Sequence, residues 1–123
     1  MTGGNSGPEH DRPAKSPALA GFERMLEAGR DSALLRYSIG NEYAKLQDWD
    51  HARAALERAV AIDPGFTAAW KLYAKALEGS GDAPAALVAY RRGIEVAKRK
   101  GDRQAEKEMT VFARRIERAS GAG

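Results

Sequence analysis

The sequence predicts an all-α fold, a short α-solenoid of antiparallel helix pairs. Alanine, leucine, glutamate, lysine and arginine, which are good helix formers, dominate the chain from its middle to its C-terminal end. Runs rich in valine, isoleucine, threonine and tyrosine, which would indicate strands, are absent from the sequence. Apolar residues recur at helical spacing in six segments. Because only a few residues separate these segments, neighbouring helices are expected to be antiparallel.

The chain is divided into a tail and one small domain. Its 123 residues, with 43% hydrophobic and 30% charged residues, suit a single soluble domain with a modest core. Residues 1–17 are rich in glycine and proline and contain almost nothing apolar. Such a segment cannot offset its ordering entropy by burial, so we predict that it is disordered. The helical domain is predicted over residues 18–120, and residues 121–123 are expected to fray.

The first predicted helix lies in the segment ALAGFERMLEAG, residues 18–29. Gly29 is expected to end it, since glycine adopts the left-handed conformation of many C-caps. A second helix is predicted from Ala33 to Leu46. The apolar residues of the first helix share one face: Leu19, Phe22, Met25 and Leu26.

The third and fourth helices follow on either side of a proline turn. The third is predicted from about Asp50 to Ile62, and Asp63-Pro64-Gly65 ends it because a residue before proline is disfavoured in the α region. The fourth runs from Thr67 to about Gly79. The sequence GSGD then provides a turn.

The fifth and sixth helices complete the domain. The fifth has Pro84 in its first turn, where a missing N–H costs nothing, and continues to about Arg99. Gly101 ends it, and Asp102 is the expected N-cap of the sixth helix. The apolar residues of the sixth helix form one stripe: Ala105, Met109, Phe112, Ile116 and Ala119.

The middle of the chain contains an internal repeat. When the sequence is shifted by 34 residues, small residues align with small ones and large apolar residues with large apolar ones. For example, Ala52 aligns with Ala86, and Leu56 aligns with Tyr90. A shift in the other direction aligns the first helix with the third, with Phe22 at the position of Leu56. The first helix is therefore interpreted as a half-repeat.

This helix–turn–helix period resembles the tetratricopeptide repeat, and the chain looks like a small bacterial-type member of that family. The resemblance covers about residues 18–119. The family pattern consists of aromatic, large apolar and small residues at fixed positions. In the second repeat it is carried by Trp70, Tyr73, Ala74, Leu77, Ala86, Tyr90 and Gly93. In the first repeat it is carried by Ile39, Gly40, Tyr43, Ala52, Leu56, Ala59 and Pro64.

Some positions depart from the pattern. Arg36 stands where the second repeat has Trp70, so Tyr37 or Leu35 is expected to fill the gap. Lys98 replaces the closing proline, which lets the fifth helix run longer. The sixth helix fits the frame only with a shift of about one residue, and we interpret it as a capping helix. Gly40 is expected to lie where the two helices of the first repeat cross closely, facing Ala52.

The sequence contains no arrangement typical of a catalytic site. It has no cysteine, which excludes disulfides, thiolate catalysis and cysteine-bound metals. Its two histidines, His10 and His51, form no pair at helical spacing. The glycine-rich GGNSG lacks the strand and helix that a phosphate loop needs. We therefore expect no enzymatic activity, no cofactor and no metal.

The resemblance instead implies a binding surface on the concave face, which the first helices of the repeats line. Such a face holds extended peptides or a partner helix. Asn41 and Lys75 align in the repeat frame, and an amide beside an ammonium group suits a carboxylate. This is similar to the clamps with which some family members hold the C-terminal carboxylates of chaperone tails. The simpler alternative is that Lys71 and Lys75 are only solvated. The predicted contact residues are Leu34, Tyr37, Ser38, Asn41, Lys45, Lys71, Lys75 and Glu78.

The predicted function is an adaptor, scaffold or co-chaperone-like module that binds a protein or peptide. One alternative is self-assembly through the end helices, with Met109, Val111 or Phe112 forming the contact. Another is nucleic-acid binding through the basic C-terminal third. That region has ten basic and five acidic residues between Arg91 and Arg118, but the two signs alternate as on a solvated helix. The N-terminus has no hydrophobic signal region and no apolar run approaches the length of a membrane span, so the expected location is the cytoplasm.

Overall fold

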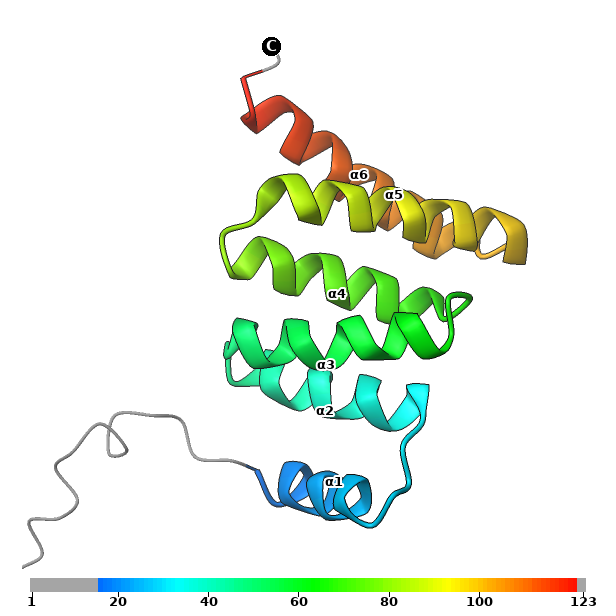
Figure 1. Ribbon diagram of the computed structural model, residues 1–123. Helices are drawn as coiled ribbons and strands as arrows, with labels where there is room; N and C mark the ends of the chain where they lie inside the picture. The colour runs from blue at the N-terminus through cyan, green and yellow to red at the C-terminus, as the bar shows by residue number, and fades with distance from the viewer. Residues whose placement is uncertain (1–15, 122–123) are drawn as a thin grey trace, which may run out of the picture.

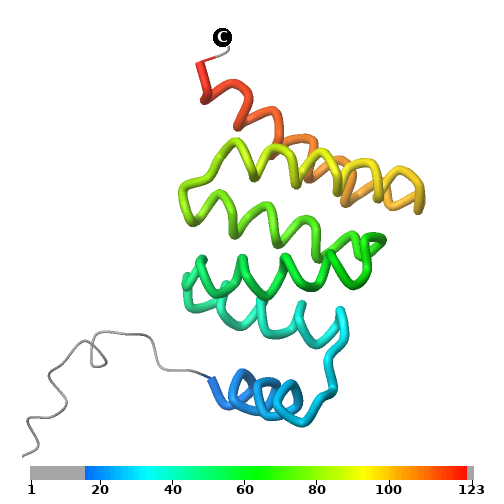
Figure 2. The backbone as a smooth tube through the Cα atoms, viewed as in Figure 1, coloured from blue at the N-terminus to red at the C-terminus, as the bar shows by residue number. Residues whose placement is uncertain are grey.

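The structure, a computed structural model, describes residues 16–121, and this part of the chain contains six α-helices and no strand. The all-α prediction is confirmed. The helices stack in chain order from one end of the molecule to the other (Figure 1), and the backbone trace follows the same path (Figure 2). The helices are α1 (Pro17–Glu27), α2 (Ala33–Lys45), α3 (Trp49–Ile62), α4 (Thr67–Gly79), α5 (Ala83–Lys100) and α6 (Arg103–Ala119).

Local sequence explains where most helices begin. In five of the six, the side chain of the N-cap residue accepts a hydrogen bond from the backbone N–H three residues later. At α1, the N-cap is Ser16, so Pro17 lies in the first turn of the helix, whereas the sequence predicts it in the tail. The rest of that tail, and residues 122–123, lie outside the described residues. The capping residues are Ser16, Ser32, Asp48, Asp82 and Asp102.

The fifth helix runs long, as the substitution of Lys98 for the family's proline predicts. It continues to Lys100 and ends at Gly101, whose φ of 71° is a left-handed conformation that favours glycine. Asp102 then caps α6 at once. The connection between these two long helices is therefore only two residues long.

The helices form two rows. We call α2, α4 and α6 the first-helix row, and α1, α3 and α5 the second-helix row. In the first-helix row, α2 contacts α4 and α4 contacts α6. Within residues 16–121, no two helices of the second-helix row contact each other. Because the helices of the first-helix row lie closer together, we expect the stack to curve with that row on its inner side, which is the side predicted to be concave.

Gly40 marks a close approach of α2 and α3. A Cβ atom on Gly40 would lie 2.5 Å from Cγ of Leu56, which is nearer than real Cβ contacts. The predicted close crossing is therefore present, but the side chain that needs the space is Leu56 and not Ala52. Gly93 has the same role between α5 and α6, where a Cβ would lie 2.6 Å from Sδ of Met109.

The sixth helix is part of the core. Met109 is fully buried, and Ala113 and Ile116 lie beside it in the largest buried cluster. The ring of Phe112 packs 5.6 Å from the ring of Tyr90. The suggestion that Met109 forms a self-assembly face is therefore wrong, because its side chain has no exposed surface. Of the three residues suggested for that face, Val111 alone is mainly exposed, at 58%.

Candidate functional site

The predicted binding residues on α2 differ in how available they are to a partner. Leu34 is 66% exposed, and the Ser38 hydroxyl donates a hydrogen bond to its carbonyl oxygen. The ring of Tyr37 lies 5.0 Å from that of Phe66, at the edge of the core. Nζ of Lys45 donates to the carboxylate of Glu42 at 3.0 Å.

Asn41 completes the predicted set on α2. It is half-buried, and its side-chain amide makes no hydrogen bond within residues 16–121. Of the two residues expected to fill the gap left by the missing tryptophan, Leu35 is buried in the core cluster beside α1, and Tyr37 is partly buried against the other two core clusters. Arg36 itself is partly buried and pairs with Asp31, with Nε 2.8 Å from Oδ1.

Two of the three predicted residues on α4, Lys71 and Glu78, are engaged by side chains of α5 and α6. Nζ of Lys71 lies 2.6 Å from Oε1 of Glu108. The carboxylate of Glu78 accepts a hydrogen bond from the hydroxyl of Tyr90 at 2.7 Å, and lies 3.5 Å from Arg115. Lys75 is exposed and has no ion pair within the described part of the chain.

These contacts change the electrostatics of the predicted carboxylate site. The Lys71 ammonium donates a hydrogen bond to Glu108 and, with Gln104, holds the pKa of that carboxyl below its ordinary value. Lys71 and Lys45 are therefore already paired with carboxylates of the same chain. Lys75 and Asn41 are the remaining candidates, and they lie on two helices that contact each other. We call these two residues, with Leu34 and Lys71, the first-helix face.

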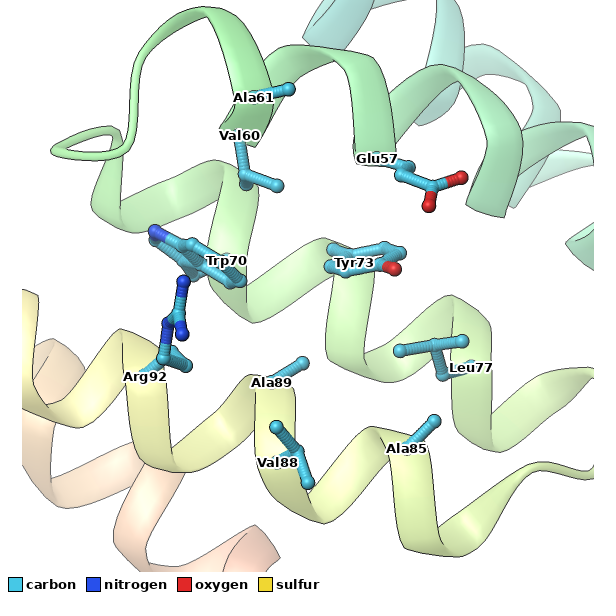
Figure 3. A pocket seen from close by; sticks show the side chains of 10 residues that line it. All are labelled: Glu57, Val60, Ala61, Trp70, Tyr73, Leu77, Ala85, Val88, Ala89 and Arg92. Carbon is cyan, nitrogen blue, oxygen red and sulfur yellow. The ribbon is translucent and has the colours of Figure 1, made fainter.

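A second surface lies on the other side of α4, and sequence reasoning missed it. Here α3 and α5 stand apart, and α4 lies beneath them, so that the three helices enclose an open pocket of about 470 Å³ (Figure 3). We call it the outer slot. Its lining is mostly apolar: Glu57, Val60 and Ala61 from α3, Trp70, Tyr73 and Leu77 from α4, and Ala85, Val88, Ala89 and Arg92 from α5.

Two aromatic rings form the floor of the outer slot. Nε1 of Trp70 donates a hydrogen bond to the carbonyl oxygen of Pro64 at 2.8 Å, which fixes the indole. The guanidinium of Arg92 lies 5.4 Å from the centre of the indole, at a cation–π distance. Burial, and then the nearby charge of Glu57, raise the pKa of Tyr73.

A signal for the slot is present in the sequence but needs the tertiary structure to be interpreted. Ala61, Ala85 and Ala89 are small residues on two helices that are not neighbours in sequence. Alanine is also a good helix former, so alanine alone does not indicate a pocket. Only the separation of α3 and α5 turns these short side chains into the walls of an opening.

Neither a cluster of metal-ligating side chains nor a membrane-spanning helix is found in the part of the chain that the structure describes. Within residues 16–121, no group of three or more acidic or histidine side chains could hold a metal ion. His51 is exposed, stacks on Tyr43 at 4.9 Å and contacts the carboxylate of Asp48. None of the six described helices is long and apolar enough to cross a membrane.

Helix pairs that repeat at a fixed spacing, cross closely at small residues and stack into two rows define a helical-repeat protein. Comparison with known proteins identifies the family within this class. Residues 33–76 match the tetratricopeptide repeat. The chain is also 45% identical over 101 residues to the TPR repeat-containing protein PA0015 of Pseudomonas aeruginosa, which covers 82% of this chain and 96% of that protein. The chain belongs to the tetratricopeptide repeat family, as predicted.

Solved structures agree with this assignment. The solution structure of protein BPP2914 from Bordetella parapertussis is 36% identical, with a TM-score of 0.75, and the match covers 87% of this chain and 93% of that one. The crystal structure of MamA has a TM-score of 0.59 at 18% identity, with 85% and 70% covered, and supports the fold alone. Tetratricopeptide repeats generally mediate protein–protein interactions and are typically not enzymes.

Proposed function

We propose that this protein is a non-enzymatic adaptor that binds an extended segment of a partner protein on its first-helix face. The observation that carries the proposal is the pair Asn41 and Lys75. Their polar groups are not engaged by hydrogen bonds or ion pairs within residues 16–121, and they lie on helices that contact each other, on the side of the stack that we expect to be concave. The other lysine of this face, Lys71, is already paired with Glu108.

The chemistry of these two residues favours a carboxylate on the partner. The Asn41 amide can donate a hydrogen bond to a carboxylate oxygen, and the Lys75 ammonium adds a charge-assisted one. Leu34, which is 66% exposed, offers apolar contact to the rest of the segment. An acidic side chain or a C-terminal carboxylate would satisfy both polar groups, so we propose a carboxylate-bearing peptide as the ligand.

The test uses a library of short synthetic peptides made in two forms, with a free C-terminal carboxylate and with a C-terminal amide. Binding is measured by fluorescence polarisation to the wild type and to the double variant Asn41→Ala/Lys75→Ala. Because carboxylate contacts are charge-assisted, we expect free-acid peptides that bind the wild type to bind the double variant about tenfold or more weakly.

The control is Lys98→Ala, which removes one positive charge from an exposed position on α5. It changes the net charge by the same amount as the double variant but leaves the first-helix face intact. We expect it to bind like the wild type. If the double variant and the control bind free-acid peptides equally well, binding takes place elsewhere and the proposed face is wrong.

A further inference from the structure

We propose that the outer slot is a second docking site, separate from the first-helix face, which binds one large apolar side chain of a partner segment. The partner segment carries an acidic residue on the side of Arg92 and a basic residue on the side of Glu57. This site uses the second-helix row and the opposite side of α4, so it does not depend on the carboxylate-binding function proposed above.

The dimensions of the slot fit such a side chain. Its volume of about 470 Å³ lies in the range of about 300–1,000 Å³ that is typical of ligand pockets. The slot stays open between α3 and α5 because three of its lining side chains are only methyl groups: Ala61, Ala85 and Ala89. A phenylalanine or leucine side chain can therefore enter between α3 and α5 and reach the aromatic floor.

The floor is arranged in advance for apolar contact. The hydrogen bond from Trp70 to Pro64 fixes the indole plane, so little side-chain entropy remains to be lost on binding. Val88 stands at the rim and is 59% exposed, a large apolar surface that nothing within residues 16–121 covers. Burying Val88 together with the partly exposed ring of Tyr73 would supply the hydrophobic contribution to affinity, whereas Trp70 is only 7% exposed and serves as a fixed support.

The rim charges indicate what flanks the apolar residue. Glu57 projects from α3 and Arg92 from α5, on opposite walls of the slot (Figure 3). Glu57 has no ion pair within the described residues, and Arg92 is held over Trp70 by its cation–π contact. A partner segment that crosses the slot meets a negative charge at one wall and a positive charge at the other. Charge complementarity then fixes its orientation.

Segments of the same chain fit this description poorly. Residues 1–15 contain Met1 as their only large apolar residue. Outside the slot, the two most exposed large apolar side chains that a second copy could offer are Leu34 and Val111. The acidic residue nearest to Leu34, Asp31, is already paired with Arg36. The neighbours of Val111 one turn away, Lys107 and Arg115, are both basic. Those charges would suit Glu57 and repel Arg92. The rim therefore favours a different protein with charges of opposite sign around its apolar residue.

The experiment uses tryptophan fluorescence in the full chain. The variant Trp49→Phe leaves Trp70, at the floor of the slot, as the only tryptophan. The probes are short alanine-based peptides with one central phenylalanine, flanked by aspartate and lysine in both orders, and the same peptides with alanine in place of phenylalanine. We expect the phenylalanine peptides to change Trp70 emission in a saturable way, one order more tightly than the other. Peptides without phenylalanine should bind about tenfold or more weakly.

Two variants with a matched control locate the binding. Ala85→Leu fills the slot and should abolish the fluorescence change, whereas Ala54→Leu, at an exposed position of α3 outside the slot, should leave it unchanged. The exchange Glu57→Arg/Arg92→Glu should reverse the preferred order of the flanking charges. Circular dichroism checks that each variant is folded. The Asn41→Ala/Lys75→Ala variant should bind these probes normally, which separates the two sites.

Several results would overturn the proposal. One is the absence of a saturable change with any phenylalanine peptide, and another is equal binding to Ala85→Leu and Ala54→Leu. A third is insensitivity of the preferred order to the charge exchange. If sedimentation shows that the protein self-associates and that Ala85→Leu alone prevents this, the occupant is a second copy and the proposed partner is wrong.

Discussion

Nζ of Lys71 on α4 lies 2.6 Å from Oε1 of Glu108 on α6, and this ion pair lies among the residues predicted to bind a partner. Both side chains are roughly one-third exposed, so water screens the pair. Glu108 thereby supplies, from within the chain, the kind of group that a partner's carboxylate would supply. The carboxylate-bearing peptide that we propose would have to compete with Glu108 for Lys71 and would meet Lys75 without that competition.

The first prediction is that Glu108→Gln strengthens the binding of free-acid peptides to the first-helix face. The substitution removes the internal competitor and leaves Lys71 available. We expect an increase in affinity of about three- to tenfold, with more effect on the association rate when the salt concentration is low. Fluorescence polarisation measures the affinity, and stopped-flow mixing measures the rate.

Glu117→Gln is the matched control for this prediction. It removes the same charge from the same helix, but Glu117 pairs with Arg91 on α5 and not with Lys71. If both variants raise peptide affinity equally, the cause is net charge and not release of Lys71. Glu108 would then have no specific role at this face.

The second prediction concerns the crossing of α2 and α3. Gly40→Ala should destabilise the fold by about 1–3 kcal/mol, since its Cβ would lie 2.5 Å from Cγ of Leu56 and force a repacking. Gly21→Ala in α1 is the control, because there the nearest side-chain atom is 3.8 Å away. It should stabilise the protein by about 0.5–1 kcal/mol through helix propensity. Urea unfolding measures both. Similar effects of the two substitutions would contradict the close approach.

The outcome at Gly40 illustrates how far local sequence predicts this fold. The predicted helix ends agree with the structure to within about two residues because caps and turn residues act over only three or four positions. Asp102 caps α6, and Pro64 follows the end of α3, as expected. The repeat also identified the close crossing correctly. It placed Gly40 opposite Ala52, whereas the atoms nearest to a Cβ on Gly40 belong to Leu56, because the direction of side chains across a helix pair depends on the crossing geometry.

The features that sequence reasoning missed all depend on how helices from different repeats are placed. The Lys71–Glu108 pair joins residues 37 positions apart, on helices whose repeat frame is shifted. The outer slot depends on the gap between α3 and α5, which no local pattern encodes. Neither periodicity nor propensity contains that information, since both describe one helix at a time.

The third prediction concerns a buried tyrosine. Tyr90 is fully buried, and its hydroxyl donates a hydrogen bond to Glu78 at 2.7 Å. Burial and this contact raise the pKa of Tyr90, so the hydroxyl keeps its proton. Tyr90→Phe should cost about 1.5–3 kcal/mol, the range for hydrogen bonds to charged groups. Tyr37→Phe is the control, as its hydroxyl makes no hydrogen bond within residues 16–121, and should change stability little. An equal cost at both positions in urea unfolding would contradict the assignment.

The last prediction is a loss of stability in acid. The hydrogen bond from Arg36 lowers the pKa of Asp31 below 3.8, and hydrogen bonds from Lys45 and then Ser16 lower the pKa of Glu42 below 4.5. Groups whose pKa is lower in the folded state stabilise it above their unfolded pKa, and this contribution is lost as the pH falls through the folded value.

The urea midpoint should therefore be nearly constant from about pH 7 to about pH 5 and fall below about pH 4. In Glu42→Gln, the urea midpoint should decrease less on acidification than in the wild type. Glu42 also accepts a hydrogen bond from Ser16 at 3.0 Å and so connects α2 to the start of α1. Glu27→Gln is the control, since Glu27 has no ion pair within the described residues. A urea midpoint that rose on acidification, or a Glu27→Gln curve as flat as that of Glu42→Gln, would show that these carboxylates do not stabilise the folded state.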